Sequence, residues 1–376
     1  MTEQIVRRGF EPVRDLFTEI AARRPGVNAA LAAYVGGERV VDLWTGPTYR
    51  ADSIQGVYSA TKGAAGLVLA LLIQRGLVDP DAPVAGYWPE FAAAGKESVT
   101  VRALASHQAG LINVDGGYTL DEFTGHASLA ERLAAQRPFW EPGSGHGYHA
   151  LTIGTLLNEL CLRVTGLPLG EYFRREVAEP YGVDFFIGLP ASEEPRVVPS
   201  LPIGIGGDGP SSSEASPLFL QAMNIANGTT ERRNLLDLRS FRAAGIASIG
   251  GFGSARGLAR MYAVATQEVD GRPPLLTPEI RRGVAEVQVA GQDLVLPFPT
   301  SYAMVFESLV PTGGPGAFGH SGANGALAYA DPDLGLAFGY TTDTPSPTAT
   351  GGADPVTVDL SRSLAAAIGA LRTSGS

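Results

Sequence analysis

The sequence predicts an α/β fold that is interrupted by a helical insertion. Segments with strand character lie near both ends of the chain, whereas residues 79–238 carry mainly helical patterns joined by long loops. We therefore expect an α/β domain made of residues 1–76 and 240–376, with a mainly helical domain over residues 77–239. An active site should lie in the crevice between the two domains.

The first part of the chain predicts two helices and a hairpin. Helical periodicity covers residues 11–24. Two strand-like segments on either side of a Gly-Gly pair predict the hairpin, residues 29–35 and 39–44. Residues 64–73 are apolar on all sides, which is typical of a fully buried helix, and Ser59 lies at its N-terminal end. The helix dipole favours developing negative charge at that end.

The rest of the chain predicts helices, then strands, then a last helix. Five helices are expected over residues 101–106, 128–136, 149–165, 169–177 and 254–266. Strands are expected over residues 316–321, 325–330 and 334–340, with a turn at Asp331-Pro332-Asp333 and a final helix over 355–371. Residues 204–214 are rich in Gly, Ser and Pro and predict a loop.

Composition narrows the class of protein. Of 376 residues, 44% are hydrophobic and 18% are charged, which suits a large core and argues against a disordered chain. The net charge is −10 and the basic residues are scattered, so we expect neither a nucleic-acid nor a membrane partner. The single cysteine, Cys161, and an N-terminus without an apolar signal segment favour a cytoplasmic protein.

One lysine is notable because the chain uses arginine almost everywhere. Lys62 and Lys96 are the only lysines among 28 lysines and arginines. Arginine keeps its proton near neutral pH, whereas burial can lower the pKa of a lysine until the amine acts as a base. Ser59 lies three residues before Lys62, so the two share one face of a helix. The pair predicts a serine nucleophile that is activated by a lysine.

Further motifs accompany this pair and carry a family resemblance. They are Leu-Ala-Ser-His-Gln-Ala-Gly-Leu at 104–111, Gly-Tyr-His at 147–149 and Gly-His-Ser-Gly-Ala-Asn-Gly at 319–325. With Val-Tyr-Ser-Ala-Thr-Lys-Gly at 57–63, they resemble the serine β-lactamase and penicillin-binding-protein superfamily, in particular the class C-like branch that includes family VIII carboxylesterases. The resemblance covers nearly the whole chain. It implies a β-lactamase-like fold, in which an antiparallel sheet is flanked by helices and a helical region is inserted. It also implies a reaction that needs no cofactor and no metal.

The resemblance also implies roles for individual residues. Ser59 would be the nucleophile, Lys62 its proton acceptor, and Tyr148 the base that shares the proton and later activates water. A phenol with a pKa of about 10 can do this only if nearby cations stabilise its phenolate. The backbone N–H groups of Ser59 and Ala323 would form the oxyanion hole. Further substrate contacts are expected from His149, His320, Ser321 and Gly322.

Two departures from the β-lactamase pattern favour an esterase. Ala150 stands where class C β-lactamases carry an asparagine that holds an amide side chain. His320 replaces the lysine of the Lys-Thr-Gly motif, so a fixed cation becomes a group that is largely neutral at pH 7. Both changes remove penicillin-recognition features and keep the residues of acyl transfer. We therefore expect a serine hydrolase that cleaves small carboxylic esters through an acyl-enzyme on Ser59.

Several alternatives stay open. The same acyl-enzyme could serve an acyltransferase, a peptide cyclase, or a weak β-lactamase or D-amino-acid peptidase, and a catalytically silent ligand-binding scaffold is the non-enzyme alternative. Gly-x-Gly-x-x-Gly at 204–209 lacks the helix that dinucleotide binding requires, so we interpret it as a loop. Gly-His-Ser-Gly-Ala at 319–323 precedes a strand, which argues against a nucleophile elbow at Ser321. His146 and His149 have no acidic partner nearby and predict no metal site.

Overall fold

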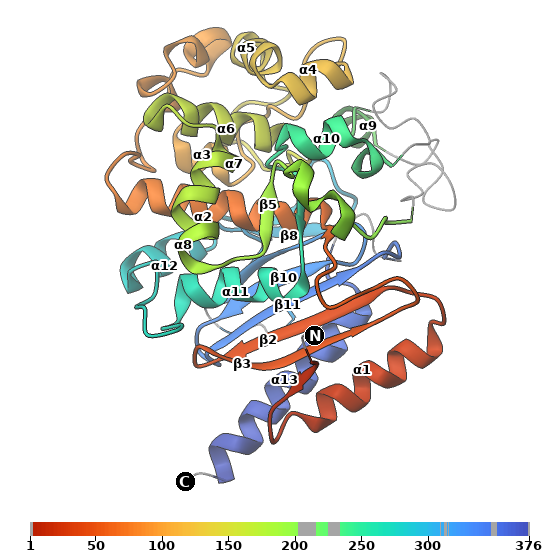
Figure 1. Ribbon diagram of the computed structural model, residues 1–376. Helices are drawn as coiled ribbons and strands as arrows, with labels where there is room; N and C mark the ends of the chain where they lie inside the picture. The colour runs from red at the N-terminus through yellow and green to blue at the C-terminus, as the bar shows by residue number, and fades with distance from the viewer. Residues whose placement is uncertain are drawn as a thin grey trace.

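A six-stranded antiparallel sheet forms the centre of the molecule (Figure 1). The computed structural model describes residues 3–201, 216–224, 234–308, 310–311, 314, 316–346 and 352–374. In sheet order the strands are β1 (Ile5–Val6), β3 (Glu38–Thr45), β2 (Ala29–Val35), β11 (Leu336–Thr342), β10 (Leu327–Asp331) and β9 (Phe318–Ser321). The sheet therefore takes its strands from both ends of the chain. The domain boundaries at residues 76 and 240 stay a prediction.

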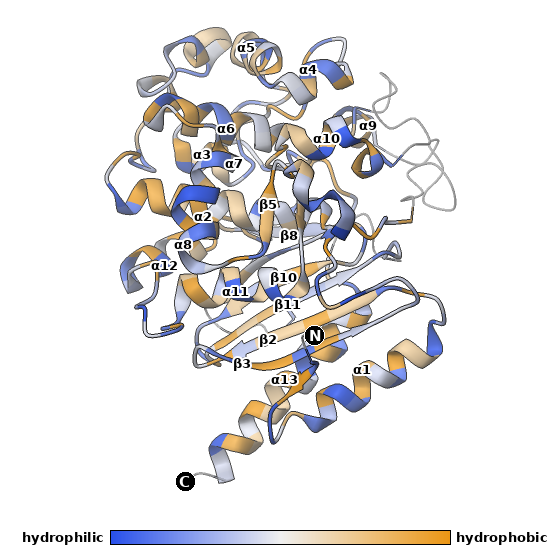
Figure 2. Ribbon diagram, viewed as in Figure 1, coloured by the Kyte–Doolittle hydropathy of each residue, from blue (hydrophilic) through white to orange (hydrophobic). Residues whose placement is uncertain are grey.

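Helices cover both faces of this sheet (Figure 1). α1 (Glu11–Arg23) and α13 (Pro355–Ser374) pack on one face, where Figure 2 shows apolar and polar residues alternating along α1. α11 (Ala255–Thr266) lies on the other face, against β2, β10 and β11. A Cβ on Gly339 would lie 2.3 Å from the carbonyl oxygen of Ala255, so only glycine lets α11 approach the sheet this closely.

The helical region lies beyond α11. Its helices are α2 (Thr61–Gln74), α3 (Val101–Ala105), α4 (Leu120–Gly125), α5 (Ala127–Ala135), α6 (Thr152–Thr165), α7 (Leu169–Phe173), α8 (Glu179–Tyr181), α9 (Pro217–Ala222), α10 (Arg239–Ala244) and α12 (Pro278–Ala285). Small sheets link it to the rest through β4 (Gln55–Gly56), β5 (Phe185–Ile187), β6 (Gly251–Gly253), β7 (Val289–Gln292) and β8 (Pro299–Tyr302).

Two predicted helices need their limits corrected. The helix expected from residue 149 begins at Thr152, because residues 149–151 form a turn whose polar groups serve other segments. The helix expected over 169–177 leaves α-helical geometry after Phe173 and continues as a π-helical turn over Arg174–Ala178. The loop predicted at 204–214, with its Gly-x-Gly-x-x-Gly match, lies outside the described residues.

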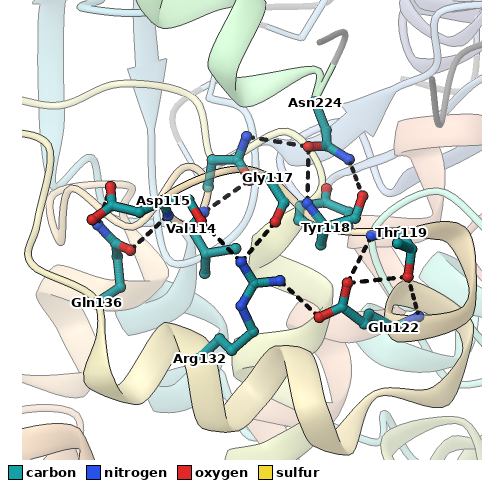
Figure 3. Close-up of polar contacts among 10 residues, drawn as sticks. Val114, Asp115, Gly117, Tyr118, Thr119, Glu122, Arg132, Gln136 and Asn224 are labelled. Atoms are coloured by element: carbon teal, nitrogen blue, oxygen red, sulfur yellow. Dashed lines mark hydrogen bonds and ion pairs between the residues drawn. The ribbon is translucent and has the colours of Figure 1, made fainter. Parts of the chain in front are cut away.

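A partly exposed guanidinium network joins the outer helices (Figure 3). Arg132 on α5 donates to the carbonyl oxygens of Asp115 and Gly117 at 2.9 and 2.8 Å and pairs with Glu122 at 2.7 Å. Glu122 also closes a capping box with Thr119 at the start of α4. One arginine thus fixes a loop and two helices whose own hydrophobic faces are short.

α2 runs through the middle of the protein, as its apolar sequence predicted. Every residue from Thr61 to Leu72 is buried. Two glycines make this packing possible, because a Cβ on Gly63 would lie 2.2 Å from the Tyr262 hydroxyl and a Cβ on Gly66 would lie 2.6 Å from the Phe306 ring. Although α2 is apolar, no helix in the described ranges has both the length and the hydropathy to span a bilayer.

Gly66→Ala tests this packing. The new methyl group would meet the Phe306 ring, which is itself held 4.8 Å from the Phe318 ring, so we expect the free energy of unfolding to fall by about 1–3 kcal/mol. Urea denaturation measures the change. Gly369→Ala on α13 is the matched control, because nothing lies within 4 Å of its Cβ and alanine should stabilise the helix by about 0.5–1 kcal/mol. Equal effects at both glycines would contradict the packing argument.

Candidate active site

Ser59 lies in a tight turn directly before α2. The turn, Tyr58–Ala60, requires a φ of +46° at Tyr58, a left-handed conformation that is strained for a residue with a side chain. Two hydrogen bonds hold it. The Tyr58 hydroxyl donates to Asn234 Oδ1 at 2.8 Å, and Thr61 Oγ1 donates to the Tyr58 carbonyl at 2.5 Å. The strain therefore occurs where the chain presents a serine at a helix N-terminus.

Lys62 is fully buried one turn further along α2. Its Nζ lies 3.2 Å from Ser59 Oγ, 2.8 Å from the carbonyl oxygen of Ala150 and 3.0 Å from that of Ser248. Burial lowers the pKa of Lys62 to about 7, although the nearby Glu307 carboxylate opposes this shift. In the neutral amine, two hydrogens can serve the carbonyls while the lone pair faces Ser59 Oγ.

Tyr148 approaches the same serine oxygen. Its hydroxyl donates to Ser59 Oγ at 2.8 Å, and its ring centroid lies 4.9 Å from Lys62 Nζ. Burial raises the pKa of Tyr148 above its ordinary value, and the carboxylates of Glu307 and Asp293 add to the shift, whereas the bond to Ser59 opposes it. The phenol therefore keeps its proton at rest, which makes Tyr148 a donor to Ser59 in this structure.

The second lysine shows what burial alone does to the pKa of an amine. Lys96 is also buried, and its Nζ donates to the carbonyl oxygens of Ala93 and Gln136, both at 2.6 Å. Burial lowers the pKa of Lys96 to about 8. The scarcity of lysine therefore selects two buried amines, and the contact with Ser59 Oγ distinguishes Lys62 from the other.

Four of the five histidines gather around Tyr148: two are its near neighbours in the sequence, and two come from distant segments. They are His107, His146, His149 and His320; the rings of His107 and His320 lie 5.3 and 6.2 Å from that of Tyr148. Burial is the main cause that lowers the pKa of His107, His149 and His320, so these three rings are neutral near pH 7. In the described part of the chain, no group of three or more His, Cys, Asp or Glu side chains could hold a metal ion.

His149 differs from the expectation that it lines the substrate pocket. Its Nδ1 lies 2.7 Å from the Gly147 carbonyl, and its Nε2 accepts the N–H of Leu111 at 2.9 Å. Both ring nitrogens are therefore occupied by backbone, and the side chain is fully buried. His149 positions the segment that carries Tyr148 and has no nitrogen left for a substrate.

The motif at residues 320–322 lies at the end of β9, the edge strand of the sheet. His320 is buried, its Nδ1 is 2.8 Å from the Ser321 carbonyl, and its Nε2 has no partner among the described residues. Ser321 Oγ and Ser321 N donate to Glu307 at 3.0 and 2.9 Å. Sequence reasoning missed Glu307, because nothing local marks it and only the pairing of Glu307 with Gly319 brings it to this motif.

The loop after β9 abuts the turn that carries Ser59. A Cβ on Gly322 would lie 2.3 Å from the Val57 carbonyl oxygen, so only glycine allows this approach. Asn324 belongs to the motif at 319–325, but the sequence predicted no role for it; it donates to the carbonyl oxygens of Gly56 and Thr342, both at 2.9 Å. Among the backbone hydrogen bonds of the described turns and loops, none has the N–H of Ala323 as its donor. These contacts place the loop that carries Ala323 next to the turn that carries Ser59, as an oxyanion hole made of their two N–H groups would require.

Comparison with known proteins places the chain in a family. Residues 13–361 match the beta-lactamase family. The chain belongs to that family. The esterase/beta-lactamase LipL of Mycobacterium tuberculosis is 35% identical over 87% of this chain and 79% of its own length. The family resemblance and the β-lactamase-like fold predicted from the sequence are thus confirmed.

Solved structures agree with this assignment. EstA from Arthrobacter nitroguajacolicus superposes with a TM-score of 0.90 and 42% identity, covering 99% of this chain and 100% of EstA. A family VIII carboxylesterase gives a TM-score of 0.88 and 34% identity, covering 97% of this chain and 99% of that one. A penicillin-binding-protein homologue from Caulobacter crescentus gives a TM-score of 0.88 and 32% identity, covering 97% of this chain and 100% of that one. The family thus includes proteins named for esters and proteins named for penicillin.

Proposed function

We propose that this protein is a serine carboxylesterase that forms an acyl-enzyme on Ser59. One observation carries the proposal: Tyr148 Oη, Ser59 Oγ and Lys62 Nζ form a continuous chain of contacts of 2.8 and 3.2 Å. A serine hydroxyl is a weak nucleophile until a base removes its proton, and a lysine with a pKa of about 7 can act as that base at neutral pH. The names of the relatives, two of them an esterase and a carboxylesterase, support ester substrates.

Acylation would start when Ser59 Oγ attacks the ester carbonyl carbon and passes its proton to Lys62 Nζ. The oxyanion would accept hydrogen bonds from the backbone N–H groups of Ser59 and Ala323. As the bond to the alcohol breaks, the alkoxide would take the Tyr148 proton. The Lys62 ammonium, 4.9 Å from the Tyr148 ring centroid, would return a proton to the phenolate. Tyr148 thus acts first as an acid, which suits its raised pKa better than the role of resting base.

Hydrolysis would repeat these steps with water in place of the alcohol. Water would attack the acyl carbonyl, its proton would pass through Tyr148 and Lys62, and Ser59 Oγ would leave as the hydroxyl. Ala150 offers no side-chain amide contact, and its carbonyl oxygen is already bound by Lys62 at 2.8 Å. His320 is neutral where a β-lactamase would present a cation. These features favour esters over β-lactams.

Covalent labelling tests the proposal. A para-nitrophenyl alkylphosphonate should add once per chain, and mass spectrometry should locate the adduct on the peptide that contains Ser59. Ser59→Ala should lose both labelling and at least about a thousandfold of para-nitrophenyl butyrate turnover, with an unchanged unfolding midpoint. Ser321→Ala is the matched control and should still be labelled. An adduct on Ser321 would contradict the assignment.

The rate should depend on pH through Lys62. Below its pKa of about 7 the amine is protonated and cannot accept the serine proton, so kcat/KM should fall as pH falls, by about tenfold per unit well below 7. The charged and titratable groups around it are Glu307, Tyr148, His107 and His320. A pH profile with para-nitrophenyl butyrate measures the midpoint. Lys62→Arg should lose more than about tenfold, because arginine keeps the charge but not the basicity. A profile that is flat from about pH 5 to about pH 9, a range centred on the pKa of Lys62, would contradict Lys62 as the base.

Asn324 should matter for turnover as well as stability. Asn324→Ala leaves two buried carbonyls unsatisfied and frees the loop that carries Ala323, so we expect kcat to fall by about tenfold or more with little change in KM. Asn158→Ala is the control, since its side chain accepts one buried bond, from Leu169 N at 2.9 Å, on α6. It should destabilise the protein and spare kcat. Loss of kcat in both variants alike would remove the special role of Asn324.

A further inference from the structure

The Glu307 carboxylate has an unusual place beside the motif of residues 320–322. Its two oxygens accept hydrogen bonds from the N–H and the hydroxyl of Ser321, and Oε1 lies 3.5 Å from His320 Nδ1. The Glu307 side chain keeps 20% of its surface exposed, so it is neither sealed in the core nor fully in solvent. Its contacts place it at the end of β9, close enough to Lys62 and Tyr148 to influence both.

Within the described residues, no arginine or lysine forms an ion pair with this carboxylate. In the described part of the chain, its ion-pair partner within 4.0 Å is His320 alone, and burial keeps that imidazole neutral near pH 7. Its negative charge acts on Lys62 and Tyr148: it adds to the raised pKa of Tyr148 and partly offsets the lowering of the Lys62 pKa by burial. The edge of the site formed by β9 is therefore electronegative.

The bond to Glu307 also fixes what Ser321 can offer. A hydroxyl has one hydrogen and two lone pairs, and the hydrogen of Ser321 Oγ is committed to Glu307 Oε1 at 3.0 Å. The Ser321 N–H is committed as well, to the other carboxylate oxygen. Only acceptor lone pairs of Ser321 remain for a ligand. A substrate group at this position must be apolar or a hydrogen-bond donor, and a carboxylate would meet lone pairs and a negative charge.

We propose that Glu307 is a specificity-determining residue that rejects substrates with a carboxylate near Ser321 and admits neutral esters or esters with a cationic or hydrogen-bond-donating group. The inference rests on the proposed esterase function, whose substrate class it narrows. The carboxylate of a β-lactam belongs to the rejected class. Like charges at close range in a partly desolvated site repel strongly, so the charge rather than the shape of the pocket should dominate the discrimination.

Three esters with one leaving group and one chain length test this proposal. They are para-nitrophenyl hexanoate, mono-para-nitrophenyl adipate and the terminally trimethylammonio-substituted hexanoate. Wild type should prefer the hexanoate and the cationic ester to the adipate. Glu307→Gln should raise the kcat/KM ratio of adipate to hexanoate by about tenfold or more and lower that of the cationic ester, because the charge is lost while the size is kept. Because each kcat/KM ratio compares two esters on the same variant, a general loss of activity in that variant does not change it.

Two further variants separate charge from structure. Glu307→Asp keeps the carboxylate, so this variant should still prefer the hexanoate and the cationic ester to the adipate, even if all three rates fall. Glu131→Gln removes the same charge from an exposed site on α5 and should leave the ratios unchanged. Unchanged ratios in folded Glu307→Gln, with thermal unfolding as the check, would overturn the inference while the esterase proposal stands. Failure of wild type to hydrolyse the hexanoate would instead overturn the proposed function and, with it, this inference.

Discussion

The buried amine of Lys62 constrains the rest of the active site. An amine in the core is tolerated only if its hydrogens find acceptors, and here backbone carbonyls of Ala150 and Ser248 supply them. Those carbonyls belong to segments about a hundred residues apart, so α2, the Tyr148 segment and the chain before β6 must all be in register for the lysine to be buried. Because these two bonds use the hydrogens of the neutral amine, its lone pair is left to face Ser59 Oγ. Burial, orientation and basicity of the amine therefore have one structural origin.

Local chemistry explains the elements that the sequence could predict. The limits of β2 were predicted correctly because Gly36 and Gly37 take φ values of +58° and +85° that few other residues adopt in a tight hairpin turn. The buried helix α2 followed from its lack of any polar face. Ser59 and Lys62 could be paired because positions three apart in a helix are neighbours whatever the rest of the chain does.

The features that escaped prediction all join segments that are distant in the chain. Glu307 reaches Ser321 through a bridge at the sheet edge, and Asn324 reaches Gly56 across 268 residues. The histidine cluster needs β9, the loop after α3 and the turn before α6 to meet. No periodicity encodes such meetings, since each depends on the register of strands and on the packing of whole helices. The rarity of lysine pointed to two buried amines, Lys62 and Lys96, but did not by itself show which of them contacts a nucleophile.

The pairing of β2 with β11 has a consequence for synthesis on the ribosome. Residues 29–35 can pair with β3 at once, but they find their second partner only when residues 336–342 have left the exit tunnel, so the central sheet cannot be completed earlier. At about 5–20 residues per second, Gly56 waits on the order of ten to fifty seconds for Asn324, 268 residues later. During that interval α2 can pack on α6 and α7, but its contacts with α12 and β9 and those of β2 with α11 and β11 are still missing. The apolar surface left exposed favours binding by chaperones. Ser59 is among the first residues of the site to be translated, and its surroundings are among the last to be completed.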